Sequence, residues 1–156
     1  MATLTTNKNF LSPVGFQLKI NSQKYPNLEY FATGVTLPGF SISEVSVPYK
    51  AVNHAVMGDR LSFENLTIRA NITENFDNYI ETFNWMHNTV NASNPEDFKE
   101  DATLLILSSH NNVNKEIKFT GIFPVSLDAI EFDAQTELSY VQCNIGFAYT
   151  NFEIIE

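Results

Sequence analysis

The sequence predicts a mainly β fold: an antiparallel β-sandwich or barrel with one α-helix packed against one side or end. Three observations support this prediction. Several segments alternate between apolar and polar residues, short turn-forming stretches separate them, and only one segment has the period of a helix. The 156 residues are enough for one large core, so we expect a single domain over residues 1–156. Residues 1–13, rich in Thr and Asn, are expected to form a flexible arm.

The first expected strand carries Phe16, Leu18 and Ile20 on one face and ends at a turn. Pro38 and Gly39 then separate two further strands, because proline withholds a backbone donor and glycine permits unusual backbone angles. The same alternation, interrupted by turn residues, continues to the end of the chain. The expected strands are residues 15–20, 28–35, 39–47, 61–72, 102–109, 115–123, 125–132 and 138–149.

Two of these strands are long and have one apolar and one polar face. The last one, residues 138–149, would span roughly 40 Å at about 3.3 Å per residue, which is long for a small domain. In residues 61–72 the alternation slips once, which indicates a bulge. The polar faces carry Asn65, Thr67, Arg69 and Asn71 in the first strand, and Gln142, Asn144, Gly146, Ala148 and, just beyond it, Thr150 in the second.

One helix is expected from Phe76 to Val90, where apolar residues recur every three or four positions. Asn75 is the candidate N-cap. Trp85 lies opposite the apolar face of this helix, so either the following loop covers it or another subunit contacts it.

Residues 48–60 have neither helical nor strand periodicity and contain a Gly-Asp turn pair near their end. Long loops of this kind are usually functional or disordered. We expect the segment to be poorly ordered or extended in an isolated subunit and to become fixed between subunits in an assembly, where a partner supplies the contacts that it lacks.

The chain has 9 Lys and Arg against 18 Asp and Glu, a net charge of −9, and residues 119–156 contain six acids and no Lys or Arg. This acidic third repels phosphate, which argues against nucleic-acid binding through it; solubility is the alternative reason for the acids. No apolar run is long enough to cross a membrane, and the start lacks the pattern of a secretion signal, so we expect a cytoplasmic protein. The single cysteine, Cys143, is expected in the core.

No catalytic, cofactor-binding or metal-binding pattern stands out. His54, His87 and His110 are scattered over a loop, the helix and a turn, without the spacing of metal ligands. His54, Asp59 and Ser62 could be assembled into a hydrolytic set, but such combinations occur by chance in many chains. We therefore expect a structural protein and not an enzyme, because exposed strand edges and polar strand faces have a use in assembly.

Four stretches carry a family resemblance, in matching order and spacing. They are "ATGVTLPG", "GDRLSFENLTI", "ETFNW" and "KEIKFTGIFPVSLDAIEFDAQTELSYVQCNIGFAY". With them the chain resembles, over nearly its whole length, the tail tube proteins of contractile-tailed bacteriophages of the T-even kind. It departs from them in the N-terminal arm, in the acidic tail, and at Phe123 and Phe132, where tryptophan is familiar.

The resemblance implies hexameric rings that stack into a tube, each subunit giving strands to a continuous β-barrel around the channel. DNA would pass through this channel during ejection without specific binding. The implied partners are further copies of the chain and the tail sheath, tape measure and baseplate proteins. The implied location is the tail of the virion, after assembly in the bacterial host cytoplasm.

A bore that lets DNA slide should be lined by small, neutral or acidic side chains, with Arg69 paired to an acid if it lies there. The sequence leaves open which polar strand faces the channel. The candidate lumen-facing residues are Gln142, Asn144 and Thr150 from one strand, or Asn65, Thr67 and Asn71 from the other. By the same resemblance, the candidate inter-subunit loop contains Lys50, Val52, His54, Val56, Met57, Asp59 and Arg60.

Two other functions remain open. A baseplate or tail-end protein of the same fold would cap or initiate the tube, and it would usually carry an added domain, for which the sequence gives no sign. A small β-barrel that binds a ligand, or a hydrolase built around His54 and Asp59, is the alternative from another class.

Overall fold

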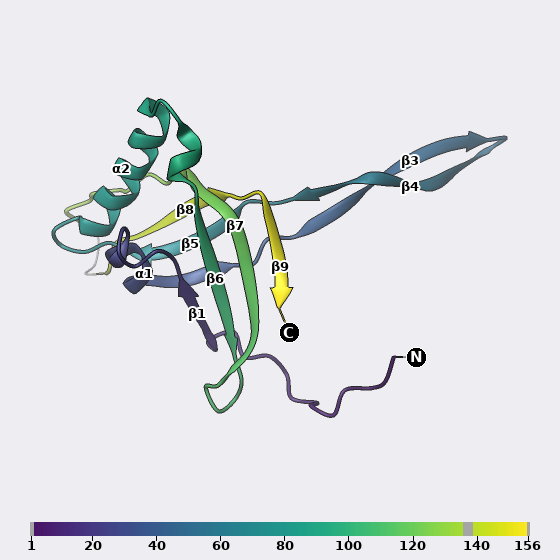
Figure 1. Cartoon of the computed structure of the whole chain (residues 1–156), viewed down its shortest axis with the longest axis horizontal. Coiled ribbons are helices and arrows are strands. Elements are labelled where there is room, and N and C mark those ends of the chain that lie inside the picture. The colour runs from purple at the N-terminus through teal and green to yellow at the C-terminus, as the bar shows by residue number, and fades with distance from the viewer. Residues whose placement is uncertain (1, 136–138, 156) are drawn as a thin grey trace.

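The computed structural model describes residues 2–135 and 139–155, and within them the fold is mainly antiparallel β, as the sequence predicts. The described part has nine strands, where eight were expected, and a short second helix and a 3-10 helix beside the expected helix (Figure 1). Residues 2–13 form no helix or strand and are exposed. In chain order the elements are β1 (Phe16–Lys19), α1 (Pro26–Tyr30), β2 (Ala32–Thr36), β3 (Phe40–Tyr49), β4 (Val52–Phe63), β5 (Leu66–Asn71), α2 (Asp77–Asn91), the 3-10 helix η1 (Pro95–Phe98), β6 (Glu100–Leu107), β7 (Val113–Leu127), β8 (Gln142–Ala148) and β9 (Asn151–Ile155).

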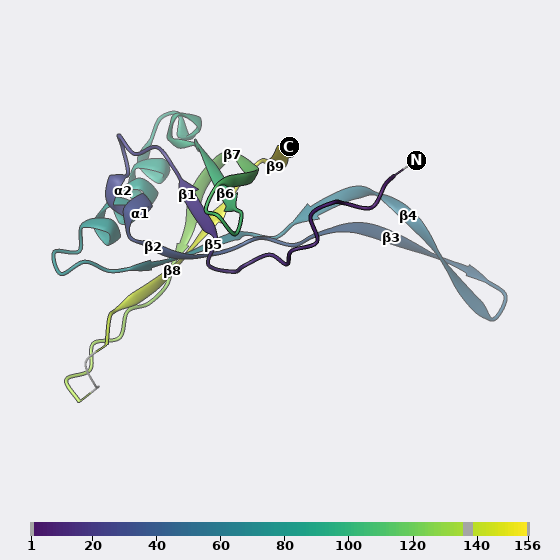
Figure 2. The same cartoon turned by 90° about the horizontal axis from the view of Figure 1, so that it is seen from below.

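Most strands belong to one seven-stranded sheet with the order β1-β6-β7-β8-β5-β2, and β9 also pairs with β7. The 15-residue strand β7 joins the two halves of this sheet: its first part pairs with β6 and β9, and its last part, from Phe123 to Leu127, pairs with β8. Strands β3 and β4 form a separate two-stranded hairpin that projects far from the body (Figures 1 and 2).

The core lies between the sheet and the helices. Phe119, Phe147, Ile68 and Leu28 are fully buried there, and burial of such side chains contributes about 1.5–3 kcal/mol each. Cys143 is buried in the same cluster, as expected from its place on the apolar face of the last long strand.

Helix α2 begins one residue later than expected and buries a different face. Phe76, not Asn75, takes the N-cap position, with φ 62°, and the Thr73 hydroxyl accepts the Asp77 N–H at 3.0 Å. The buried residues are Asn78, Thr82 and Trp85, whereas most of the apolar side chains that predicted the helix are partly or fully exposed.

Aromatic stacking decides which face of α2 is buried. Trp85 stacks on Tyr25 with ring centroids 4.1 Å apart, and its indole N–H donates to the Phe98 carbonyl of η1 at 2.8 Å. Asn78 donates to the Asn71 carbonyl at 2.6 Å, so its burial leaves no unsatisfied amide. Trp85 is therefore covered by its own chain: the segment after α2 supplies the Phe98 carbonyl, as the first of the two explanations expected, and the ring contacts come from Tyr25 and Phe147.

Two expected strands are wrong in their bounds. Residues 28–30 end α1 instead of starting a strand, because the Glu81 carboxylate of α2 accepts hydrogen bonds from the Leu28 N–H and the Asn27 amide, at 3.1 and 2.7 Å. Residues 125–132 form no strand of their own, because β7 continues to Leu127 through a bulge at Val125, directly after Pro124, and a strand tolerates proline beside a bulge.

The two long amphipathic strands are shorter than expected. Strand β8 covers seven residues and starts at Gln142, where its partner β5 ends, while Leu138 lies outside the described residues. The slip in residues 61–72 is a break and not a bulge: Glu64 exchanges hydrogen bonds with Gly39, and the chain passes there from the hairpin to the sheet.

Residues 48–60 are extended but they are not a loop, so the expectation that they form no strand is wrong. They belong to β3 and β4, joined by a tight turn in which Lys50 has φ 57°. Periodicity gave no strand signal here because every residue of the hairpin is exposed except the half-buried Gly58. Neither face of the hairpin is buried, so apolar and polar side chains need not alternate.

Candidate assembly interface

Four of the six candidate lumen residues, Thr67, Asn71, Gln142 and Asn144, lie side by side on one face of the sheet. Strands β5 and β8 pair so that Arg69 faces Asn144 and Asn71 faces Gln142. The Gln142 amide donates to the Asn71 side-chain oxygen at 3.0 Å. The opposite face of the same two strands is buried: Leu66, Ile68, Ala70, Cys143, Ile145 and Phe147. The structure thus brings together two strands between which the sequence could not choose.

The polar face continues into the strands on either side. Thr36 of β2 pairs with Thr67, and Ser126 of β7 pairs with Gly146, which has no room for a side chain because a Cβ there would collide with the Ser126 hydroxyl. We call β2, β5, β8 and residues 123–127 of β7 the four-stranded sheet. Its outer face carries mainly small or neutral polar side chains, together with the cation Arg69 and, opposite Ala148, the aromatic ring of Phe123.

Two of the candidate residues lie outside the strands of this sheet. Thr150 sits at the corner between β8 and β9, where its N–H donates to the Thr120 carbonyl at 2.9 Å. Asn65 is exposed at the junction of β4 and β5.

Arg69 is exposed, and no ion pair joins it to an acid within residues 2–135 and 139–155. Its guanidinium lies over Gly34, where an added Cβ would be 3.0 Å from Nη2. The glycine therefore makes room for the arginine, and the acidic partner expected for Arg69 is not supplied by the described residues of its own chain.

Both edges of the four-stranded sheet are free of strand partners in the described chain. Strand β2 pairs only with β5, and residues 123–127 of β7 pair only with β8, because the pairing of β6 with β7 ends at Ile122. Exposed edges present unpaired backbone N–H and C=O groups and readily pair with another chain. The sequence contains no local signal for this feature, since pairing across a sheet is set by the topology.

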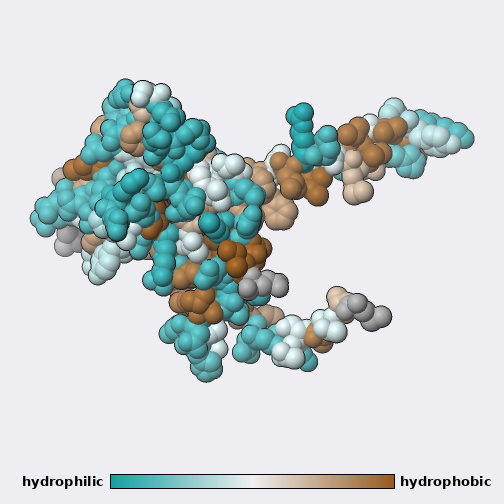
Figure 3. Space-filling model, in the orientation of Figure 1, coloured by the Kyte–Doolittle hydropathy of each residue, from teal (hydrophilic) through white to brown (hydrophobic). Residues whose placement is uncertain are grey.

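The β3–β4 hairpin exposes many large apolar residues, seen as brown atoms along the projection in Figure 3. Near the body, Phe40 faces Phe63 and Ile42 faces Leu61, and both phenylalanine rings contact Phe152 of β9. Beyond the bulge at Ser43 and Gly58, Val45 pairs with Val56, Tyr49 pairs with Val52, and between them Val47 pairs with His54.

The apolar side of the hairpin changes at this bulge. Side chains alternate along a strand, so Phe40 and Ile42 lie on one face, and Val45, Val47 and Tyr49 lie on the other. Gly58 lies at the bulge because a Cβ there would collide with the side chain and carbonyl of Ser43. The first apolar patch contacts Phe152 of the body, whereas the side chains of the second are exposed in the described part of the chain.

The candidate inter-subunit residues all lie on this hairpin. Lys50 is in the turn, with its ammonium 5.5 Å from the centre of the Tyr49 ring, and the others, from Val52 to Arg60, lie in β4. His54, Asp59 and Ser62 are spread along this one extended strand, over roughly 26 Å at about 3.3 Å per residue between the first and the last. They cannot act on one substrate atom, so the hydrolytic set is excluded.

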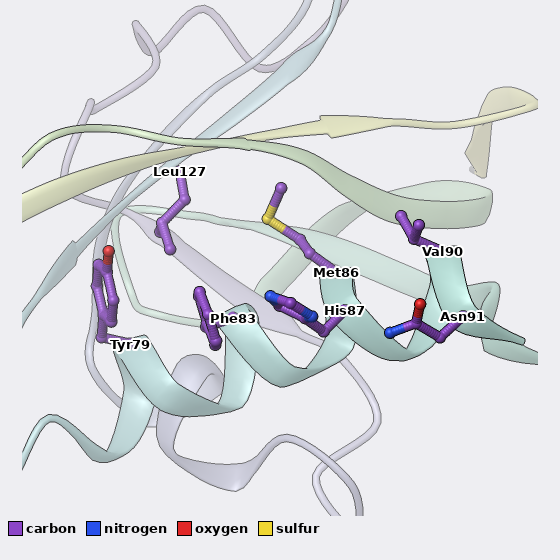
Figure 4. Close-up of a pocket in the computed structure, with 7 residues that line it drawn as sticks. All are labelled: Tyr79, Phe83, Met86, His87, Val90, Asn91 and Leu127. Atoms are coloured by element: carbon purple, nitrogen blue, oxygen red, sulfur yellow. The ribbon is translucent and has the colours of Figure 1, made fainter.

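A surface groove of about 490 Å³ runs along α2, opposite Leu127 of β7 (Figure 4). Its lining is mostly apolar: Tyr79, Phe83, Met86, His87, Val90, Asn91 and Leu127. Five of these residues, Tyr79, Phe83, Met86, His87 and Val90, belong to the spacing that predicted the helix. No group of three or more possible metal ligands gathers in the described part of the chain, and none of its helices is long and apolar enough to cross a membrane.

Solved structures with the same fold come from contractile injection systems. A chain of the extracellular contractile injection system PVC, from its sheath–tube complex in the extended state, matches with a TM-score of 0.69 and 16% identity, over 98% of this chain and 99% of that one. The tube-terminating cap of the anti-feeding prophage AFP matches with a TM-score of 0.70 and 13% identity, over 98% and 95%. The chain shares the fold of these proteins.

A third match is more distant. Hcp1 from Flavobacterium johnsoniae aligns with a TM-score of 0.53 and 16% identity, over 93% of this chain and 94% of that one. No family model and no curated protein matches the sequence. The likeness therefore lies in the three-dimensional fold and covers nearly the full length of each matched chain.

Proposed function

We propose that the chain is the structural subunit of a contractile-tail tube: six copies close into a ring, and the rings stack around a channel through which DNA is ejected. One observation carries the proposal. The four-stranded sheet has one buried face, one polar face and a free edge on each side, so copies can pair edge to edge into a closed barrel. The fold shared with a sheath–tube complex and a tube cap supports the same function.

In the ring, the polar face lines the bore with Thr67, Asn71, Gln142 and Asn144. These neutral side chains do not displace counterions from phosphate, so the duplex slides. An acid from a neighbouring copy is the expected partner of Arg69.

The β3–β4 hairpin reaches the neighbouring subunit or the next ring. Its length, and the apolar patch that its own body leaves bare, suit such a connector. Sheath, tape measure and baseplate proteins complete the proposed set of partners, and the tail of a virion assembled in the bacterial cytoplasm is the proposed location. This function requires neither a catalytic centre nor a cofactor.

Negative-stain electron microscopy of the purified protein tests the proposal. We expect rings or tubes with a central hole. A protein that stays monomeric at high concentration, by sedimentation and by microscopy, would contradict it.

Lysine substitutions test which face lines the bore. Tubes of Gln142→Lys or Asn144→Lys should hold double-stranded DNA at low salt and release it as salt rises. Thr150→Lys, at the corner of β8 and β9, is the matched control and should leave DNA binding at the wild-type level. Equal DNA binding by all three variants would exclude this face as the lining.

A protein that caps or terminates the tube is the second candidate, favoured by the likeness to the AFP cap. It would form single rings that bind the end of a tube and do not grow, whereas a tube subunit grows into long tubes. A closed ligand-binding barrel is not favoured, because the interior is filled by aromatic and aliphatic side chains.

A further inference from the structure

The two flanks of α2 differ in the single chain. On one flank α1 packs against the helix, held by the hydrogen bonds from Asn27 and Leu28 to Glu81. On the other flank lies the surface groove between α2 and Leu127, which we call the α2 groove; there the Phe83 side chain is 46% exposed and the Val90 side chain 83% exposed. A helix with an apolar exposed face lacks a partner on that face.

The groove is continuous with a free sheet edge. Leu127 lines the groove and also ends the part of β7 that has no strand on its outer side. Leu127 pairs with the buried Ile145, so it belongs to the face of the sheet on which the core and α2 lie. A strand added to this edge would bring its own core-side elements next to the groove.

The opposite end of the four-stranded sheet carries a surface that could fill the groove. There β2 is the free edge, and exposed apolar residues flank it: Tyr30 at the end of α1, 81% exposed, and Leu37 just after β2, 48% exposed. These residues cannot reach the groove of their own chain, because β5 and β8 separate β2 from β7.

The charges of the two ends are also complementary. Residues 70–98, which include α2, contain five acids and no Lys or Arg, and residues 119–156 contain six acids and none. The side formed by α1 and β2 is less acidic: it carries one charged residue, Glu29, whose carboxylate accepts the Ile20 N–H. Lys19 of β1, next to Ile20, is exposed, while Lys24 pairs with Glu100 of its own chain. Opposite potentials on two surfaces favour their association and fix its direction.

We propose that the α2 groove is filled by a second copy of this chain, which docks the side formed by α1 and β2, with Tyr30 toward the groove. This contact rests on the proposed ring. In the ring, the β2 edge of one copy extends the sheet at residues 123–127 of the next copy. Helix α1 of the first copy then lies beside α2 of the second. The contact joins different surfaces head to tail, which is the geometry that closes a ring.

The test is Phe83→Glu, a change at a half-exposed position that places a charge in the groove. We expect the variant to fold but to assemble less readily. The half-assembly concentration, at which half of the chains are in rings, should be at least tenfold higher than for the wild type, as measured by sedimentation and native mass spectrometry. Val113→Glu at the far end of β7, also half exposed, is the matched control and should assemble like the wild type. Normal rings from Phe83→Glu would overturn the inference but leave the tube function standing, whereas a wild type without rings would remove both.

Cross-linking tests the occupant directly and does not depend on the glutamate variant folding. In Tyr30→Cys with Val90→Cys, a short bismaleimide should link neighbouring copies into a ladder of oligomers, and neither single variant should give one. The native Cys143 is buried and does not compete. A ladder from Val47→Cys with Val90→Cys, and none from the Tyr30 pair, would place the hairpin in the groove and overturn the assignment.

Discussion

The four-stranded sheet and the β3–β4 hairpin are both antiparallel ladders with alternating side chains, but only the sheet has an interior. In β5 the residues alternate between fully buried and partly exposed, whereas in β3 all ten residues are exposed. A two-stranded ribbon is at best marginally stable in water unless other elements cover it. The comparison teaches that the sheet is stabilised by its own chain, whereas the distal hairpin has no core of its own in the described chain.

The two regions also use glycine differently. In the sheet, Gly34 and Gly146 leave space for the side chains of Arg69 and Ser126, which lie over them. In the hairpin, Gly58 permits a close backbone approach at the bulge, and the apolar side chains change faces there. The sheet glycines shape a surface, and the hairpin glycine determines where the distal apolar patch points.

The largest expected effect is a complete loss of assembly while the body stays folded. Replacing residues 44–57 by an Asn-Gly turn removes the distal hairpin and leaves the sheet intact. We expect a folded monomer that unfolds cooperatively in urea, like the wild-type body, and forms no tubes by electron microscopy. Tubes of normal length from this variant would show that the hairpin is not the connector.

Truncating a core side chain of the sheet should lower the free energy of unfolding, whereas truncating a hairpin side chain should leave it nearly unchanged. Phe147→Ala empties a fully buried site and should lower the free energy of unfolding by about 3–5 kcal/mol, measured by urea denaturation of the monomer. The matched change in the hairpin, Val47→Ala, should alter it by less than about 0.5 kcal/mol, because the side chain is exposed. A comparable loss in both variants would mean that the hairpin is folded into the body in solution.

A smaller effect is expected at the bulge. Gly58→Val forces β4 away from Ser43 and redirects the distal patch. The free energy of unfolding should stay within about 0.5 kcal/mol of wild type, while the half-assembly concentration rises about tenfold, which corresponds to about 1.4 kcal/mol. Ala55→Val, at an ordinary ladder position, is the control, and equal assembly of the two variants would contradict the role of the bulge.

The last expected effect concerns pH and the body alone. Burial, with the Glu100 and Glu81 carboxylates nearby, raises the pKa of Tyr25 to about 12 from its ordinary value of 10.0. The stability linked to neutral Tyr25 is therefore fully present below pH 10 and is lost as the pH rises toward 12. Urea denaturation across this range should show a smaller loss for Tyr25→Phe than for the wild type, and equal losses would exclude Tyr25 as the cause.

The sequence by itself determined the features that depend on local order. The alternation in β5 and β8 predicted one buried and one polar face, with Cys143 on the buried one. The spacing of apolar residues in α2 predicted a helix with nearly correct ends. The negative charge of residues 119–156, which contain acidic residues but no Lys or Arg, follows directly from composition. Each of these follows from backbone geometry or composition, which distant contacts do not alter.

Only the tertiary structure decided which surfaces meet. Helix α2 buries Trp85 and not its more apolar face, because the stack with Tyr25 and the bond to Phe98 come from distant segments. Residues 28–30 are helical because Glu81 binds the first turn of α1, and residues 48–60 are strands because they pair with each other outside the core. Periodicity reports the apolar side of an element, but the partner that covers that side, in this chain or in a neighbouring copy, is set by contacts between residues far apart in sequence.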